Sequence, residues 1–194
     1  YNMGICMFRD KKINESTLQH FINIHKIKDD TKILDLTAYG IFIDDYEYLY
    51  NLNEITELNL HSSIIDDLKY IIHLKKLNRL SLKLCINITD FTYLNFLENL
   101  NHLDLSSTKI ESNFLLNLPQ SLISLNLSNT KIDSINNLPR LKYLTTLNLY
   151  NCFKIKDFQP LTSMNNLYTL NLKRTGFNDL KIFYGKNNPI NIIV

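Results

Sequence analysis

Glycine and proline are scarce in this sequence, with four of each among 194 residues. Phosphate-binding loops need closely spaced glycines, because the backbone must approach the phosphate directly. The sequence contains no such loop, no nucleophile elbow and no zinc-ligand signature. This scarcity argues against the common nucleotide-binding and hydrolytic sites. We therefore expect no enzyme activity, no metal and no cofactor.

Cysteine is also rare, and the three cysteines are Cys6, Cys85 and Cys152. Small secreted domains use dense and evenly paired cysteines, so this odd and scattered set favours a reducing compartment. The sequence has no apolar run of the roughly 18 residues that a membrane-spanning helix needs. Residues Tyr1–Asp10 also lack the pattern of a signal peptide. We expect an intracellular, cytoplasmic protein, with secretion as an effector or a lost targeting segment as open alternatives.

The charges are nearly balanced, since 21 Lys and Arg face 19 Asp and Glu for a net charge of +2. Such a balance gives no general attraction to nucleic acid or to an anionic membrane. One local row of lysines is followed within two or three residues by a row of acids: Lys109, Lys131 and Lys154, then Glu111, Asp133 and Asp157. Rows of alternating sign are most often solvated edges. We expect neither nucleic acid nor a membrane as a partner.

A motif of the form Leu-x-x-Leu-x-Leu recurs through most of the chain, most plainly at Leu100, Leu103 and Leu105. Its seven copies begin at residues 31, 55, 77, 100, 122, 144 and 167, so their spacing is 22 to 24 residues. The alternation of Leu103 and Leu105 predicts a short strand with one buried face. One coil cannot bury that face alone, so we expect neighbouring coils to stack into a parallel sheet over a continuous leucine core.

With this motif and period, the chain resembles the leucine-rich repeat family from Asp30 to Asn188. In that family the ninth place of each repeat holds Asn, Cys or Thr, which hydrogen-bonds the turning backbone. The ninth-place residues here are Tyr39, Ser63, Cys85, Thr108, Thr130, Cys152 and Thr175. Ser63 is a near match, and only Tyr39, in the degenerate first copy, breaks the rule. The resemblance implies an α/β repeat solenoid, an arc with a concave parallel β-sheet.

The convex side of this solenoid is expected to consist of short irregular or 3-10 segments. The runs Ile88–Asp90 and Asp157–Leu161 resemble those of cysteine-containing and internalin-like repeats. We divide the chain into an N-terminal cap at 1–30, seven repeats at 31–188 and a C-terminal cap strand at 189–194. Possible helix-capping residues at Asn14–Thr17 precede apolar residues at helical spacing, which predicts an amphipathic capping helix.

Partners of this family generally bind the concave face, so the resemblance implies that outward-facing strand and turn residues carry the function. Large side chains form two groups in the repeat register. One group is His61, Arg79, Lys83 and His102, and the other is Tyr150, Lys173 and Arg174 with second-place Tyr168 beside them. Tyrosine and arginine dominate interface hot spots, so the second group is the preferred anchor.

The remaining polar candidates have structural interpretations. Cys85 and Cys152 occupy the ninth place, and we expect them to be buried and inert. His61 and His102 lie two coils apart, roughly 10 Å by the strand spacing, which is too far to share one zinc ion. The short polar residues of the fifth place fit a crowded concave surface or repeat duplication: Asp35, Asn59, Ser81, Asp104, Asn126, Asn148 and Asn171.

The sequence therefore predicts a non-catalytic module, monomeric when free, that binds another protein through its concave face as an effector or regulator. Two alternatives stay open. The first is an adaptor or substrate-receptor subunit of phosphatase-regulator or ubiquitin-ligase type, for which residues 1–30 are the only candidate recruiting segment. The second is the recognition domain of an enzyme whose catalytic part lies outside this sequence.

Overall fold

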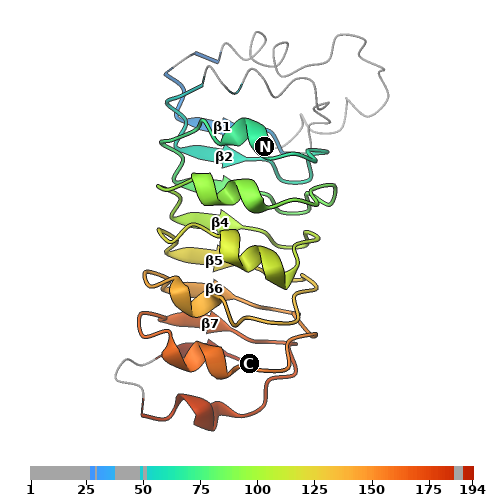
Figure 1. Ribbon diagram of the computed structural model, residues 1–194, viewed down its shortest axis with the longest axis vertical. Helices are drawn as coiled ribbons and strands as arrows, with labels where there is room; N and C mark the ends of the chain where they lie inside the picture. The colour runs from blue at the N-terminus through green and yellow to red at the C-terminus, as the bar shows by residue number, and fades with distance from the viewer. Residues whose placement is uncertain (1–26, 29, 38–48, 50–51, 186–189) are drawn as a thin grey trace, which may run out of the picture.

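The computed structural model describes residues 27–28, 30–37, 49, 52–185 and 190–194. The predicted capping helix, Cys6 and ninth-place Tyr39 lie outside the described residues. The described chain winds into a stack of coils (Figure 1). Each repeat contributes one strand of three residues, and most also contribute one short 3-10 helix on the opposite side of the coil.

The strands form a single parallel sheet of eight in chain order. They are β1 (Ile33–Asp35), β2 (Glu57–Asn59), β3 (Arg79–Ser81), β4 (His102–Asp104), β5 (Ser124–Asn126), β6 (Thr146–Asn148), β7 (Thr169–Asn171) and β8 (Asn191–Ile193). The 3-10 helices are η2 (Lys69–Ile71), η3 (Thr92–Phe96), η4 (Ser112–Asn117), η5 (Leu138–Arg140), η6 (Gln159–Ser163) and η7 (Leu180–Phe183). This arrangement confirms the predicted solenoid and its short convex segments.

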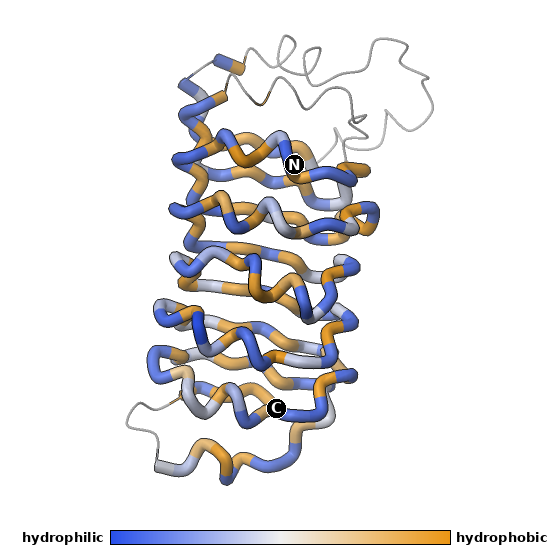
Figure 2. The backbone as a smooth tube through the Cα atoms, viewed as in Figure 1, coloured by the Kyte–Doolittle hydropathy of each residue, from blue (hydrophilic) through white to orange (hydrophobic). Residues whose placement is uncertain are grey.

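Neighbouring strands pair so that residues at the same place of each repeat lie side by side. The middle leucine of each strand faces the middle leucine of the next, as Leu103 faces Leu125 and Leu125 faces Leu147. These leucines are buried, whereas the residues on either side of them point away from the core. Apolar and polar residues therefore alternate along each coil (Figure 2).

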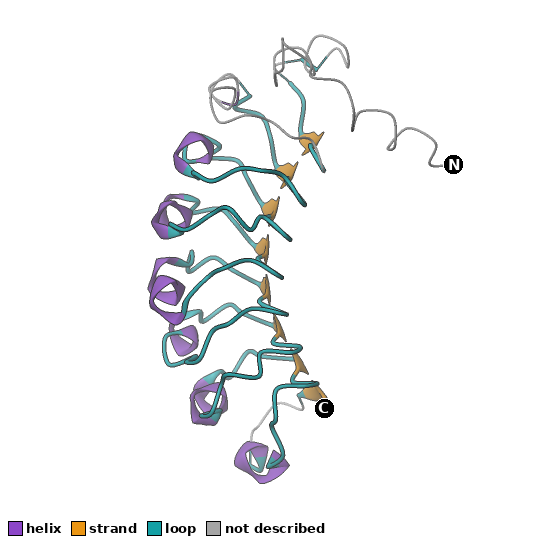
Figure 3. Ribbon diagram, turned by 90° about the vertical axis from the view of Figure 1, so that its right-hand side faces the viewer, coloured by secondary structure: helices purple, strands orange, loops and turns teal. Residues whose placement is uncertain are grey.

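The stack is curved, with the strands on the concave side and the 3-10 helices on the convex side (Figure 3). A helical turn is thicker than the roughly 4.8 Å that separates paired strands, so the coils spread on the helix side. The space between the two sides is filled by apolar residues such as Leu105, Ile110 and Leu115, each fully buried. The outward residues of the strands therefore lie on the concave surface.

The C-terminal strand β8 continues the sheet beside β7. Ile192 faces Leu170 in the register, and its half-buried side chain packs against the core. The last coil is further closed by Phe177, whose ring meets those of Phe158 and Phe183 at centroid distances of 5.1 and 5.8 Å. The apolar residues after the seventh repeat thus lie against the final leucines.

The ninth-place residues form a buried polar ladder, as the family resemblance implies. The hydroxyl groups of Thr108 and Thr130 donate to the carbonyl oxygens of Leu105 and Leu127, both at 2.7 Å. The Cys152 thiol donates to that same Leu127 carbonyl at 3.0 Å. Each of these side chains satisfies a carbonyl that the turn removes from the sheet. The predicted burial of Cys85 and Cys152 is confirmed, and their low reactivity stays a prediction.

The fifth-place residues have a local structural role that the sequence interpretation did not include. In Asp104, Asn126 and Asn148, the side-chain oxygen accepts the backbone N–H two residues later at 2.8 to 3.0 Å. Asp35, Asn59 and Asn171 make the same bond. Such turns are typical of Asp and Asn, which explains the short polar column without invoking crowding, duplication or a partner.

The buried leucine ladder predicts a strong dependence of stability on single residues. Leu125 is 1 % exposed, so Leu125→Ala should lower the free energy of unfolding by about 2 to 5 kcal/mol. Ser124→Ala, on the outward face of the same strand, should change it by less than about 0.5 kcal/mol. Asn126→Ala should fall between them, at about 1 kcal/mol, because it removes the turn hydrogen bond. Denaturant unfolding of the three variants tests this order, and equal costs for Leu125 and Ser124 would contradict the register.

The thiol ladder predicts low reactivity. Burial raises the pKa of Cys85 and of Cys152, and both side chains are fully buried. In a Cys6→Ser variant, neither thiol should react with a maleimide or disulfide reagent until the protein unfolds. Because the folded state holds these protons more tightly, stability should fall as the pH rises above about 8.5, the usual thiol pKa. Rapid labelling of the folded variant would refute the ladder.

Candidate protein-binding surface

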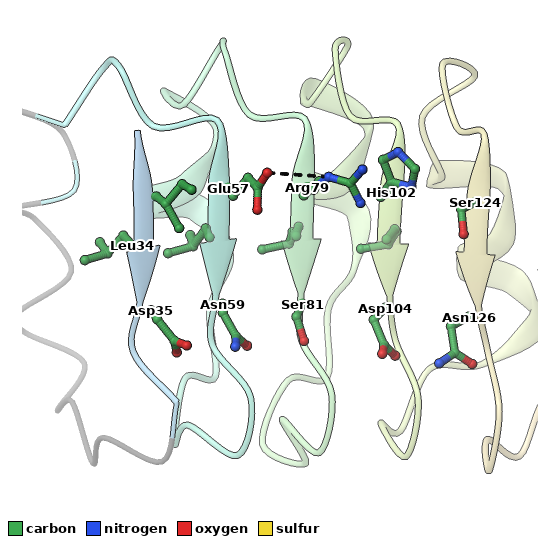
Figure 4. A pocket seen from close by; sticks show the side chains of 14 residues that line it. Leu34, Asp35, Glu57, Asn59, Arg79, Ser81, His102, Asp104, Ser124 and Asn126 are labelled. Atoms are coloured by element: carbon green, nitrogen blue, oxygen red, sulfur yellow. Dashed lines mark ion pairs between the residues drawn. The ribbon is translucent and has the colours of Figure 1, made fainter. Parts of the chain in front are cut away.

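An open groove of about 490 Å³ lies on the concave face, over β1 to β5. One row of its lining residues stands at the start of the strands and includes Glu57, Arg79 and His102 (Figure 4). A second row, at the end of the same strands, includes Asn59 and Asp104. The backbone of the strands forms the floor between these rows, because the side chains of the middle leucines are buried on the core side of the sheet. The groove is therefore a largely polar trough, with the exposed Ile33 at its β1 end.

The strand register places Arg79 directly between Glu57 and His102. Arg79 Nε lies 3.5 Å from Glu57 Oε1, and both side chains are about half exposed. Burial lowers the pKa of His102, and the positive charge of Arg79 lowers it further, while Glu57 opposes both effects. His102 is therefore neutral near pH 7 and can both donate and accept a hydrogen bond. An exposed ion pair of this kind is worth at most about 1 kcal/mol, so a partner can exchange it readily.

The first sequence-predicted group divides between the two ends of the strands. Arg79 and His102 begin β3 and β4 and line the groove, whereas His61 and Lys83 follow the ends of β2 and β3. The groove instead brings Arg79 and His102 together with Glu57. Glu57 holds the third place of its repeat, as Arg79 and His102 do, but the sequence analysis did not single it out. Its alignment with Arg79 across neighbouring repeats was the available signal.

The second group also divides. The Arg174 guanidinium carbon lies 5.7 Å from the centre of the Tyr150 ring, which is a cation–π contact between neighbouring coils. Lys173 is exposed beside Arg174. Tyr168, which is 63 % exposed, precedes β7 and so lies at the opposite end of that strand. The structure thus places Tyr150, Lys173 and Arg174 on one edge and Tyr168 on the other.

We call the edge where the chain leaves the strands the exit edge; it comprises places seven to eleven of the second to seventh repeats. The eighth-place residue of each of these repeats has a left-handed backbone, with φ between 58° and 61°. This conformation directs its N–H to the seventh-place carbonyl of the next coil, as from Ser107 to Ser128 at 2.9 Å. Asparagine tolerates such a φ well, and Asn129 and Asn151 occupy two of the positions. Leu84 and Arg174 are costlier choices.

The described residues contain no group of three or more His, Cys, Asp or Glu side chains placed to hold a metal ion. Over the same residues, no helix is both long enough and apolar enough to cross a membrane.

Comparison with known proteins agrees with the fold. The family described as leucine rich repeats (2 copies) matches residues 120–163. No curated protein matches the sequence significantly. Internalin C2 of Listeria monocytogenes is 25% identical with a TM-score of 0.60, over 82% of this chain and 80% of its own.

Two further solved structures are similar over part of their length. The Listeria monocytogenes internalin InlF is 25% identical with a TM-score of 0.64, over 83% of this chain and 48% of its own. A leucine-rich repeat protein of Leptospira interrogans is 20% identical with a TM-score of 0.60, over 82% of this chain and 47% of its own, and shows likeness of fold alone. The repeat copies, the coil geometry and these likenesses together show that the chain is a leucine-rich repeat solenoid.

Proposed function

We propose that this chain is a non-catalytic protein-interaction module that receives a partner protein on its concave face. The observation that carries the proposal is the sheet itself, which presents the outward residues of eight parallel strands on one inwardly curved surface. The groove over β1 to β5 forms a depression in that surface. Leucine-rich repeat proteins are commonly protein-interaction modules, which supports the same conclusion.

We further propose that the main anchor is the C-terminal pair of Tyr150 and Arg174, with Lys173 beside it and Tyr168 across the sheet. The cation–π contact between Tyr150 and Arg174 restrains the flexible arginine side chain before binding. Preorganisation of this kind lowers the entropy cost of forming an interface. Arg79 and His102 in the groove form a second contact region. The free protein is proposed to be monomeric and to reside in a reducing compartment.

A photo-crosslinking experiment tests the face of binding. Benzoylphenylalanine placed at Thr146, on the concave side of β6, should form adducts with the partner in extracts of the native cell or host. The same residue placed at Asn113, which is exposed on convex η4, should not. Adducts from Asn113 alone would move the binding face to the convex side. Each variant must melt at the temperature of the unmodified protein for the comparison to count.

The anchor is tested by the double variant Tyr150→Ala/Arg174→Ala. Neither side chain belongs to the buried core, so the melting temperature should be nearly unchanged. Affinity for the crosslinked partner, measured by calorimetry, should fall by about 2 kcal/mol or more, which is roughly thirtyfold. A folded double variant with full affinity would shift the anchor to the groove, where Arg79→Ala and His102→Ala are the next variants.

A further inference from the structure

The exit edge is positively charged along most of its length. Its basic residues are Lys83, Lys109, Lys131, Lys154, Lys173 and Arg174, all of them exposed. No Asp or Glu occupies places seven to eleven in the second to seventh repeats. Successive coils lie about 4.8 Å apart, so these cations form a line along the solenoid axis. A line of like charges favours a ligand of opposite sign.

The neighbouring acids do not pair with this line. Among the described residues, ion pairs within 4.0 Å involve Lys69, Lys76 and Arg79, none of which is on the exit edge. Asp90 and Asp157 instead accept backbone N–H groups at the start of the convex helices, both at 2.8 Å. Asp133 shares a hydrogen bond with Ser112, and Lys154 acts on it only through space. Lys109, Lys131 and Lys154 are exposed, as expected for a solvated edge, and none of them makes an ion pair among the described residues.

An apolar patch adjoins the line at the second and third repeats. Ile64, Leu84 and Ile86 are 37 %, 40 % and 50 % exposed. Leu84 also has a φ of 59°, which is costly for leucine. Asn129 and Asn151 show the cheaper solution at this place, since they tolerate the backbone and join two coils by a side-chain hydrogen bond of 3.0 Å. Folding alone therefore gives no reason for an exposed leucine at position 84.

We propose that the exit edge binds an acidic segment of a partner protein, with an apolar side chain of that segment on Ile64, Leu84 and Ile86. The proposal rests on the proposed interaction function and gives the partner its chemistry. Carboxylates of the segment pair with Lys109 and Lys131, and its far end reaches Tyr150 and Arg174. From the third to the seventh repeat the distance is about 19 Å, which an extended peptide spans with about six residues.

The aliphatic patch distinguishes a peptide from a nucleic acid. Both ligands satisfy a row of lysines, but nucleic acids bind through phosphate contacts and base stacking on aromatic rings or Arg. Tyr150 and Arg174 at the far end of the edge offer such a platform, but the exposed aliphatic side chains of Ile64, Leu84 and Ile86 do not, whereas they suit a leucine or isoleucine of a peptide. The combination of patch and charge therefore favours a protein segment.

The probe is a fluorescent peptide of about ten residues, enough to span the edge, with leucine near one end and glutamate at every second position after it. Fluorescence anisotropy should show saturable binding to the whole protein, weakened when salt is raised from about 50 to about 300 mM. A peptide with lysine in place of glutamate should not bind. Equal or tighter binding of single-stranded polyuridylate would overturn the proposal in favour of a nucleic-acid surface.

Two variants test the residues. Leu84→Asn should leave the melting temperature unchanged or raise it, yet weaken peptide binding several-fold. Lys109→Glu/Lys131→Glu should weaken it by about tenfold or more, because each attractive pair is replaced by a repulsive one. The matched control is Lys75→Glu/Lys142→Glu, which reverses the same number of charges at two exposed lysines on the edge where the chain enters the strands, and it should bind as the unmodified protein does.

The outcomes separate this inference from the proposed function. A lower melting temperature for Leu84→Asn would show that Leu84 serves the fold, and equal losses for the two double lysine variants would show only a general charge effect. Either result, or the absence of saturable peptide binding, overturns the exit-edge proposal. The concave-face proposal would still stand if adducts form from Thr146, and it falls separately if they form only from Asn113.

Discussion

A single coil of this chain cannot bury its own leucines, and the rest of the structure depends on that constraint. The coil exposes them on both of its flat sides, so only a neighbour in the same register removes them from water. The strand pairing that joins Leu103 to Leu125 and Leu125 to Leu147 is the result. Once the coils are stacked, the leucine, ninth-place and fifth-place positions all have fixed structural roles. Residue type can then differ between repeats at the other outward strand residues and at the other exposed places of the exit edge.

That division explains how much could be predicted from the sequence. The period and the leucine pattern predict the strands, the buried face and the ladder, because burial imposes one residue type at each of these places. The fifth-place hydrogen bonds were missed, although Asn126 and its counterparts are typical turn-forming residues. The grouping of site residues was predicted less well. Residues at the same place of neighbouring repeats lie close together, but residues at different places can lie at opposite ends of a strand, as Tyr168 and Arg174 do at β7.

The repeat pattern also does not predict how surface side chains contact one another. The 5.7 Å contact between Tyr150 and Arg174 depends on the rotamers of both side chains. The Glu57–Arg79 ion pair becomes apparent only when the third-place residues of neighbouring repeats are compared. The left-handed backbone conformation at the eighth place could not be predicted from residue type, since the residues at that place range from serine and asparagine to leucine and arginine. Leu84 and Arg174 are of residue types for which a left-handed backbone is energetically costly. Both side chains are exposed, one apolar and one cationic. The exit-edge proposal rests on such a costly choice at Leu84.

Partners are proposed to contact the strand face and its exit edge rather than the convex side. Hydroxyl-radical footprinting of the free and partner-bound protein measures this directly, because oxidation follows side-chain exposure. Tyr168 and Phe153, which are 63 % and 55 % exposed, should be protected in the complex, while convex Phe96 and Leu116, at 48 % and 56 %, should be oxidised as in the free protein. Protection of Phe96 and Leu116 with no change at Tyr168 and Phe153 would contradict the account.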